Sequence, residues 1–401
     1  MDTYVRFNFE PVRADGVYLY DKNGNKVLDF AGGVAVNVLG YNNHAIEKAV
    51  IKQLHKGFFS QSNNFFNEDA ENFAKSLCKS AGFFDEKTNI ISGKAFFCNS
   101  GAEANETAIK IARKRYNSLC EREYNEVICM DNAFHGRTIA TISATNRKKL
   151  TNGFEPLSTG FKQAKLNDIN SVEKLITEHT CAVMLETIQG EGGIVACEQD
   201  FLKELRQLCN YHKIALILDE VQCGNGRTGR YFAYQNYDII PDIITTAKGV
   251  AGGLPMGVCI AKSEFADFLT KGSHGATFGG NALCCSVAQA VLNYINDDIF
   301  LKNVQKMGDI LISKLQQLKE EYNDIIENIS GVGLMVGIKF FDYIESRKVA
   351  ENMLFQGLSC APASNNTLRF LPPLIITENH INEACEKLKT AIDSMKIIER
   401  Y

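Results

Sequence analysis

Apolar and polar segments alternate between about residues 90 and 265 of the chain. Short apolar runs that are typical of strands are separated by longer, helix-like stretches. Because the strands are apolar on both faces, they predict a mostly parallel sheet that is covered by helices on both sides. The predicted strands are 94–98, 127–131, 182–186, 214–219, 243–247 and 257–261, and the predicted helices are 101–116 and 200–212.

The two ends of the chain show a different pattern. Residues 16–30 predict a β-hairpin around Asn23-Gly24, a dipeptide favoured in tight hairpin turns. The segments after residue 290 predict an amphipathic helix, a strand and a last helix at 299–322, 332–341 and 378–396. We therefore predict an α/β fold with a large domain and a smaller α+β domain, divided as 56–295 for the large domain and 1–55 with 296–401 for the small one. The sequence alone does not show that the two ends meet.

The composition is that of an ordinary globular protein, with 45% hydrophobic and 22% charged residues among 401. A net charge of -4 gives no reason to expect nucleic acid or an anionic membrane as a partner. No apolar run approaches the ~18 residues of a membrane span. The first residues also lack the apolar core of a signal peptide. We therefore expect a cytoplasmic protein.

Cysteine and histidine spacing gives no sign of a disulfide framework or a metal site. The 13 cysteines are an odd number, are scattered through apolar segments and form no Cys-x-x-Cys pair, which favours reduced, buried thiols. None of the seven histidines stands at metal-ligand spacing from another histidine or from a cysteine pair. The cysteines are Cys78, Cys98, Cys120, Cys129, Cys181, Cys197, Cys209, Cys223, Cys259, Cys284, Cys285, Cys360 and Cys385.

Candidate chemistry follows the predicted strands, because ligands of open α/β sheets bind beyond the carboxyl ends of the strands. After the strand at 94–98 comes "NSGAEANE", in which Ser100 and Glu103 match a capping box. Gly101 and Ala102 then stand in the first turn of a helix, where free N–H groups can hold a phosphate. A plain capped helix is the alternative interpretation.

Two further loops carry residues that suit a planar anionic ligand. Phe134 and Arg137 in "NAFHGRT" offer an aromatic ring for stacking and a guanidinium for a carboxylate. The loop "TIQGEGG" carries Gln189 and Glu191. A surface loop with a solvated arginine, and a glycine turn with polar decoration, are the respective alternatives.

The strand at 214–219 ends in Asp219, which follows aliphatic residues and therefore needs a buried partner. Its carboxylate could hold a protonated pyridine nitrogen, while Val221 packs beneath the ring and Gln222 donates to a phenolic oxygen. A structural aspartate is the alternative. The nearby "GNGRTG" matches a dinucleotide fingerprint, but Asp219 and Glu220 upstream would repel a pyrophosphate and no good helix follows.

Lys248 in "TTAKGVAGGLPMG" completes the set. A buried lysine tends to lose its proton, and a neutral amine forms a Schiff base with a carbonyl. Taken alone, a lysine that extends from a loop into solvent is the simpler interpretation. Together, however, the sheet ends supply groups for a phosphate, a pyridine ring, its nitrogen, its oxygen and an aldehyde, which are the parts of pyridoxal phosphate.

The chain resembles the class III (ornithine-type) aminotransferases of the fold-type I pyridoxal-phosphate family. The resemblance covers nearly the whole chain and rests on "LDFAGGVAVNVLG", "NSGAEANETAIKIAR", "AFHGRT", "ETIQGEGG", "LDEVQCGNGRTG", "TTAKGVAGGLPMG", "HGATFGGNAL" and "LRFLPPLI". It implies a homodimer with active sites at the interface, and small amino-acid and 2-oxo-acid substrates. The residues that it implies for the cofactor are Lys248, Asp219, Gln222, Phe134, Val221, Ser100, Gly101, Ala102 and Glu220, with Thr277 supplied by the neighbouring subunit.

The same resemblance implies how substrates are bound. Arg137 takes the distal carboxylate of the substrate, Arg369 binds the α-carboxylate of glutamate, and Glu191 shields Arg369 when the other substrate is present. The chain departs from the family at Ala276, where a hydroxyl is common, and at Val34, where ornithine aminotransferases carry a tyrosine. An apolar Val34 favours N-acetylornithine over ornithine as the amino donor.

Three alternatives stay open at this point. Another class III aminotransferase, acting on 4-aminobutyrate, ornithine, succinylornithine or succinyldiaminopimelate, would share the same scaffold. A pyridoxal-phosphate-binding regulator is disfavoured by the intact Lys248, Asp219, Arg137 and Arg369. A nicotinamide oxidoreductase would rest on the weak "GNGRTG" match.

Overall fold

The computed structural model describes residues 1–61, 63–119 and 125–398. The main sheet has the strand order β6-β14-β13-β12-β9-β7-β8. β14 is antiparallel to both of its neighbours and the other pairings are parallel, so the prediction of a mostly parallel sheet is confirmed. The strands are β6 (Gly93–Cys98), β14 (Gly257–Lys262), β13 (Ile243–Thr246), β12 (Ala215–Asp219), β9 (Thr180–Glu186), β7 (Glu126–Met130) and β8 (Phe161–Ala164).

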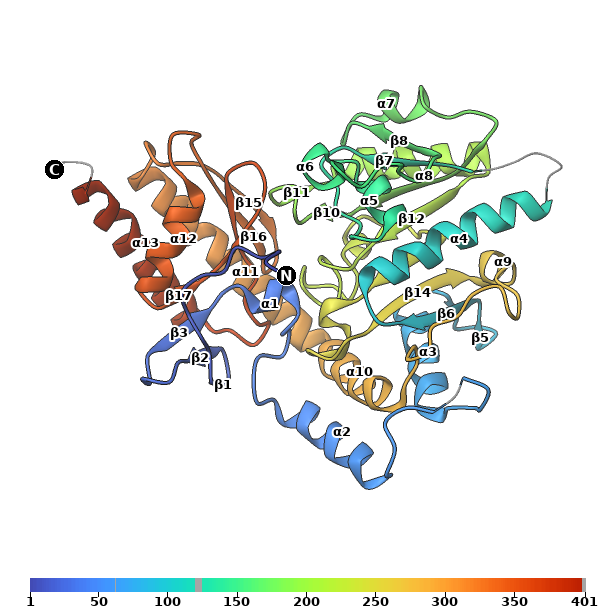
Figure 1. Ribbon diagram of the computed structural model, residues 1–401, viewed down its shortest axis with the longest axis horizontal. Helices are drawn as coiled ribbons and strands as arrows, with labels where there is room; N and C mark the ends of the chain where they lie inside the picture. Colours follow the sequence, from blue (N-terminus) through green and yellow to red (C-terminus); the bar gives the residue numbers. More distant parts are fainter. Residues whose placement is uncertain (62, 120–124, 399–401) are drawn as a thin grey trace.

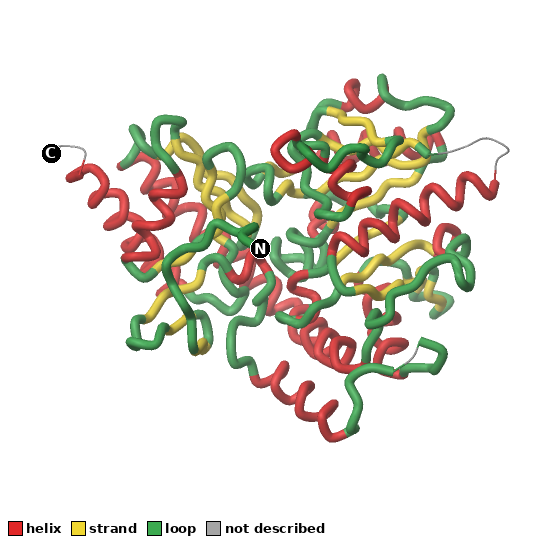
Figure 2. The backbone as a smooth tube through the Cα atoms, viewed as in Figure 1, coloured by secondary structure: helices red, strands yellow, loops and turns green. Residues whose placement is uncertain are grey.

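Helices cover both faces of this sheet, as Figures 1 and 2 show. Alternate strand residues face opposite ways, so that Ile217 joins a core cluster with α4 while Leu218 joins the larger cluster with α8. Every residue of β9 and β12 is buried, which accounts for their continuous apolar character. The first face is covered by α4 (Gly101–Leu119), α5 (Ile139–Thr145) and α9 (Ser263–Ala266), and the second by α3 (Glu68–Ser80), α7 (Ile169–Glu173), α8 (Gln199–His212) and α10 (Ala282–Ile295).

The two ends of the chain do meet, at the left of Figure 1. Strand β3 of the N-terminal hairpin pairs in parallel with β17, and Ser359 Oγ donates to Asp29 Oδ1 at 2.5 Å across 330 residues. The hairpin predicted around Asn23-Gly24 is confirmed as the β2–β3 pair. The elements of this sheet are β1 (Arg13–Asp15), β2 (Tyr18–Tyr20), β3 (Lys26–Asp29) and β17 (Leu358–Ser359). The domain boundaries given above stay a prediction.

The C-terminal part adds an antiparallel sheet in the order β15-β16-β19-β18. The predicted single strand at 332–341 was wrong, because a turn at Gly333 and Leu334 divides β15 from β16. Both predicted helices of this part are confirmed as α11 and α13. Its elements are α11 (Asp298–Glu321), β15 (Ile326–Val332), β16 (Met335–Phe340), α12 (Ser346–Phe355), β18 (Ala361–Pro362), β19 (Thr367–Phe370) and α13 (Glu378–Ile398).

Short elements connect these layers. One of them, α1, is a left-handed turn in which Val34 has a φ of 62° and Ala35 a φ of 66°. Such a conformation costs a non-glycine residue about 1–2 kcal/mol, so the surrounding packing must hold it. The longer helix α2 (His44–His55) packs against α10, and the short elements are α1 (Gly32–Ala35), β4 (Phe84–Asp85), β5 (Ile90–Ile91), α6 (Lys148–Thr151), β10 (Ile188–Gln189), β11 (Val195–Ala196), η1 (Ala233–Asn236) and η2 (Lys248–Ala251).

The thiol prediction is confirmed for the cysteines that the structure describes. All of them are free, and all are buried except Cys385, which is half-buried. Cys120 lies outside the described residues. None of the described helices has the length and apolar character needed to cross a membrane.

Candidate active site

A cavity of about 440 Å³ opens where the carboxyl ends of β7, β9, β12 and β13 converge. It unites loops that lie far apart in the sequence, as expected for an open α/β sheet. Of the predicted site residues, those that line it are Ser100, Gly101, Ala102, Phe134, Arg137, Asp219, Val221, Gln222 and Lys248. The other lining residues are Val36, Asn99, Asn105, His135, Gly136, Glu186, Ala247, Gly253, Leu254, Pro255 and Met256.

The first turn of α4 forms one wall of the cavity. Ser100 Oγ accepts the Glu103 N–H at 3.2 Å, which is the first half of the predicted capping box. The second half of the capping box differs from the prediction. The Glu103 carboxylate accepts a hydrogen bond from the Asn99 N–H at 2.5 Å, rather than from the Ser100 N–H. A Cβ on Gly101 would stand 2.8 Å from Val221, so only glycine lets the start of α4 lie this close to Val221. The N–H groups of this turn can hold an anion.

Lys248 is the first residue of η2 and lines the cavity. Its φ of 46° lies in the left-handed region, which costs a non-glycine residue about 1–2 kcal/mol and is common at functional sites. Its ammonium forms no hydrogen bond or ion pair with any described residue. Burial lowers the pKa of Lys248, which favours the neutral, nucleophilic amine.

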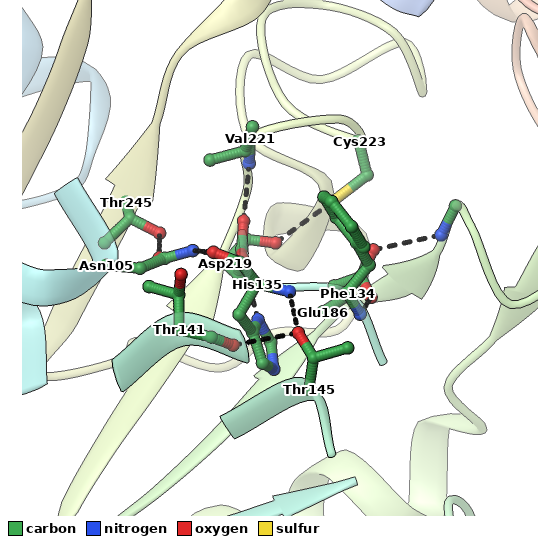
Figure 3. Close-up of polar contacts among 11 residues, drawn as sticks. Asn105, Phe134, His135, Thr141, Thr145, Glu186, Asp219, Val221, Cys223 and Thr245 are labelled. Atoms are coloured by element: carbon green, nitrogen blue, oxygen red, sulfur yellow. Dashed lines mark hydrogen bonds and ion pairs between the residues drawn. The ribbon is translucent and has the colours of Figure 1, made fainter. Parts of the chain in front are cut away.

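Asp219 lies at the base of the cavity, within a network that Figure 3 shows. Its Oδ1 accepts the Val221 N–H at 3.0 Å. Its Oδ2 accepts a hydrogen bond from Asn105 Nδ2 at 2.7 Å and lies 2.9 Å from His135 Nδ1. A carboxylate has about four acceptor positions, so these three contacts leave one position of Asp219 without a partner among the described residues, in a residue that lines the cavity. The predicted partner for a buried Asp219 is therefore this network rather than a structural arginine.

Three residues of the site were missed in the sequence. Asn105 stands one helical turn after Gly101 and Ala102, and its Oδ1 accepts a hydrogen bond from the Thr245 hydroxyl at 2.6 Å. His135 directly follows Phe134 and is 2% exposed. Glu186 is an acidic residue at the end of the apolar strand β9. The same pattern drew attention to Asp219, so Glu186 could have been found from the sequence in the same way. Burial, and then the charge of Asp219, raises the pKa of Glu186 to about 7.

Arg369 and Glu191 form an ion pair beside the cavity. Arg369 Nη1 lies 2.5 Å from Glu191 Oε1. The same nitrogen donates to Gln222 Oε1 at 3.0 Å. This contact leaves the amide nitrogen of Gln222 as the group that can donate to a ligand oxygen. The shielding of Arg369 by Glu191 during catalysis stays a prediction, and so does the role of Gln222 toward a cofactor oxygen.

Phe134 and Arg137 share one wall of the cavity. The guanidinium carbon of Arg137 lies 5.5 Å from the centroid of the Phe134 ring, within cation–π range. Arg137 is exposed and forms no ion pair with any described residue. Its guanidinium is thus available for a carboxylate that enters from solvent.

The structure does not bring the Glu220 side chain to the cavity. It points to the other side of β12, where its carboxylate accepts the N–H groups of Ala233 and Tyr234 at 2.7 and 3.0 Å and the hydroxyl of Thr187 at 2.7 Å. Because neighbouring strand-end residues face opposite ways, Asp219 takes the cavity and Glu220 anchors η1.

Other predicted positions also lie outside the cavity. Ala276 and Thr277 line a separate surface hollow with Asn63, whose side chain donates to the Ala276 carbonyl at 2.9 Å. Val34 packs against a small apolar cluster that includes Met335 and does not line the cavity, whereas Val36 does. The left-handed turn of α1 accounts for this difference, because it changes the direction in which successive side chains point.

Pyridoxal phosphate, which the sequence predicts, fits this donor set. The α4 turn suits its phosphate, Phe134 and Val221 suit the two faces of its ring, and the open acceptor position of Asp219 suits a ring N–H. Lys248 is the amine for its aldehyde. These assignments stay predictions for each residue.

Comparison with known proteins gives the same family. The family described as aminotransferase class-III matches residues 2–392. The chain is 41% identical to an acetylornithine aminotransferase of Methanocaldococcus jannaschii over 99% of this chain and 96% of that protein. It is 39% identical to a succinylornithine transaminase of Yersinia pseudotuberculosis over 98% of this chain and 94% of that protein.

The solved structures agree. An ornithine aminotransferase from Toxoplasma gondii superposes with a TM-score of 0.92 at 27% identity, over 99% of this chain and 93% of that one. This likeness confirms the predicted fold class. From the family match, the relatives and the cavity that joins Lys248 to Asp219, we conclude that the chain belongs to the class III aminotransferases, which are pyridoxal-phosphate-dependent enzymes.

Proposed function

We propose that the chain transfers the δ-amino group of N2-acetyl-L-ornithine to 2-oxoglutarate, giving N-acetyl-L-glutamate 5-semialdehyde and L-glutamate, a step of arginine biosynthesis. The observation that carries this proposal is the Arg369–Glu191 ion pair beside a cavity whose wall also holds the exposed Arg137, which has no ion-pair partner among the described residues. The acetylornithine aminotransferases among its relatives support it.

The two substrates place different demands on the site. Both have a carboxylate far from the reacting carbon, which suits the exposed Arg137. Only 2-oxoglutarate also has a carboxylate next to that carbon, which suits Arg369. When acetylornithine is bound, Glu191 neutralises Arg369, so the incoming amine does not meet an unpaired positive charge.

The protein supplies binding and proton transfer. When bound, pyridoxal phosphate withdraws electrons from the carbon that loses its proton and carries the amino group between substrates. Asp219, fixed by Asn105, His135 and the Val221 N–H, provides the negative charge that keeps a ring nitrogen protonated. Lys248 Nζ, whose pKa is lowered by burial, can take up and return a proton as a general base and acid.

We also propose a homodimer, in which Thr277 serves the partner's cavity. Large aromatic side chains gather beside Thr277, with Phe65, Phe66 and Phe278 exposed at 71, 97 and 63%. Their segments lie side by side, because Asn67 donates to the Gly280 carbonyl at 2.8 Å. An exposed apolar surface of this kind is typical of a subunit interface.

The free, buried cysteines support the proposal of a cytoplasmic location.

An absorbance titration of the purified protein tests the reaction. N-acetylornithine should change the cofactor spectrum in a single turnover, and 2-oxoglutarate should restore it. Comparison of kcat/KM for N-acetylornithine, N-succinylornithine, ornithine and 4-aminobutyrate then ranks the donors. A higher value for any donor other than N-acetylornithine would reassign the substrate within the family, and no spectral change with any amine would refute the enzyme activity.

A further inference from the structure

Glu186, at the end of β9, is a buried carboxylate that the roles above do not explain. Its side chain lines the cavity, the residue is 4% exposed, and it forms no salt bridge with any described residue. Removing a carboxylate from water without a counter-ion is costly unless hydrogen bonds compensate. Its hydrogen-bond partners therefore indicate what it does.

The two oxygens of Glu186 bind two different loops. Oε1 accepts the Phe134 N–H at 2.9 Å, a contact that Figure 3 shows, and Oε2 accepts the Gly190 N–H at 3.0 Å. Phe134 belongs to the loop after β7, and Gly190 to the loop after β10. One side chain thus links two loops that follow the neighbouring strands β7 and β9, and a second contact, from Gln189 Nε2 to the Asp131 carbonyl at 2.7 Å, lies beside it.

Each loop carries a residue of the site. The first presents the Phe134 ring to the cavity. In the second, Gly190 precedes Glu191 and lies so close to Gln222 that a Cβ on Gly190 would stand 2.2 Å from Gln222 Oε1. That same oxygen accepts the hydrogen bond from Arg369. The backbone position of Gly190 therefore limits where Gln222, and through it Arg369, can lie.

We propose that Glu186 is a positioning residue that couples the ring-stacking Phe134 to the Glu191–Arg369 pair. The inference rests on the proposed function, because the pair matters only when two unlike substrates alternate. A carboxylate suits the task since both of its oxygens accept hydrogen bonds. A glutamine offers one acceptor and would turn an NH2 group toward one of the two N–H donors.

The test compares Glu186→Gln with Glu220→Gln. Glu220 is an equally buried carboxylate that also accepts two backbone N–H groups, but it lies outside the cavity. For each variant, the cofactor dissociation rate is measured by absorbance after dilution without substrate. The apparent Kd of N-acetylornithine and that of 2-oxoglutarate are measured in separate single-turnover half-reactions.

The measurements are made at about pH 8.5, where Glu186 is ionised. Loss of one charge-assisted hydrogen bond then predicts at least about tenfold faster cofactor release from Glu186→Gln. The ratio of the two apparent Kd values should shift about tenfold against N-acetylornithine, because a displaced Glu191 leaves Arg369 unshielded. Glu220→Gln should lower Tm without changing either quantity.

The proposal is overturned if either quantity stays within about twofold of wild type in Glu186→Gln, or if Glu220→Gln changes both equally. Should Glu186→Gln fail to fold, Glu186→Asp, which keeps the charge but is too short to reach both loops, is judged by the same criteria. The dissociation measurement uses no substrate. Inactivity of wild type toward N-acetylornithine would therefore refute the proposed function without deciding the role of Glu186.

Discussion

Replacing Arg369 with alanine should damage one half-reaction and spare the other. Arg369 is 2% exposed, and its guanidinium holds Glu191 at 2.5 Å and Gln222 at 3.0 Å. In the 2-oxoglutarate half-reaction this guanidinium would exchange Glu191 for the α-carboxylate of the substrate. Two charge-assisted hydrogen bonds to a buried guanidinium are worth about 3–4 kcal/mol, so kcat/KM should fall by about 10²–10³-fold.

The N-acetylornithine half-reaction should change little, because its substrate has no carboxylate near Arg369. The Glu191 side chain is 27% exposed and can be solvated once its partner is gone, so the loss should stay within about 1 kcal/mol, or about fivefold. Stopped-flow absorbance of the cofactor measures the two half-reactions separately. Arg137→Ala is the matched control, since it should slow both.

A further variant distinguishes charge from geometry. Arg369→Lys keeps a positive charge but loses the planar fork, so its 2-oxoglutarate half-reaction should fall between those of wild type and Arg369→Ala. Equal slowing of both half-reactions by Arg369→Ala would refute the reasoning. It would mean that the amino donor also places a carboxylate on Arg369, as expected for an enzyme that acts on an α-amino group.

Four more predictions follow from the site. Lys248→Ala should abolish turnover and remove the absorbance band, near the visible edge, of the Schiff base between Lys248 and the cofactor, and full activity would disprove its role. Asp219→Asn should lower kcat on the order of 10²-fold with cofactor still bound, whereas an unchanged kcat would make Asp219 structural. The pKa of Glu186 is raised from 4.5 to about 7, so the folded protein holds this proton more tightly than the unfolded chain, and stability that is present below pH 4.5 is lost as the pH rises through 7. Between pH 4.5 and 7.5 the free energy of unfolding of wild type should therefore fall relative to that of Glu186→Gln, as measured by urea unfolding, and parallel pH profiles would contradict this. Phe66→Asp should shift sedimentation from dimer to monomer, and an unchanged dimer would place the interface elsewhere.

The sequence was sufficient to locate the cavity because parallel strands end at a common edge. Asp219 and Lys248 are adjacent to the same cavity for this reason, although their loops are separated in the chain. The apolar runs also predicted β9 and β12, since a strand that is buried on both faces has no polar alternation.

Side-chain direction and tight turns were harder to predict. Strand alternation predicts that Asp219 and Glu220 face opposite ways, but nothing in "DEVQ" shows which of the two faces the cavity. The partners of Asp219 come from other elements, and only the packing of α4 against the sheet brings Asn105 near it. The turn at Gly333 is hidden within an apolar run, because the turn itself is buried and needs no polar residues.

The pairing of β3 with β17 has a consequence for how the chain is made. Residues that line the cavity end at Met256, so they have all left the ribosome before β17 and β19 are synthesised. Asp29 is synthesised 330 residues before Ser359, its hydrogen-bond partner. Contacts this distant in sequence form late and leave early segments unpartnered during synthesis. Every described residue that lines the cavity is thus synthesised before Arg369. If Arg369 distinguishes the two substrates as proposed, translation adds that ability to a chain whose cavity residues are already present.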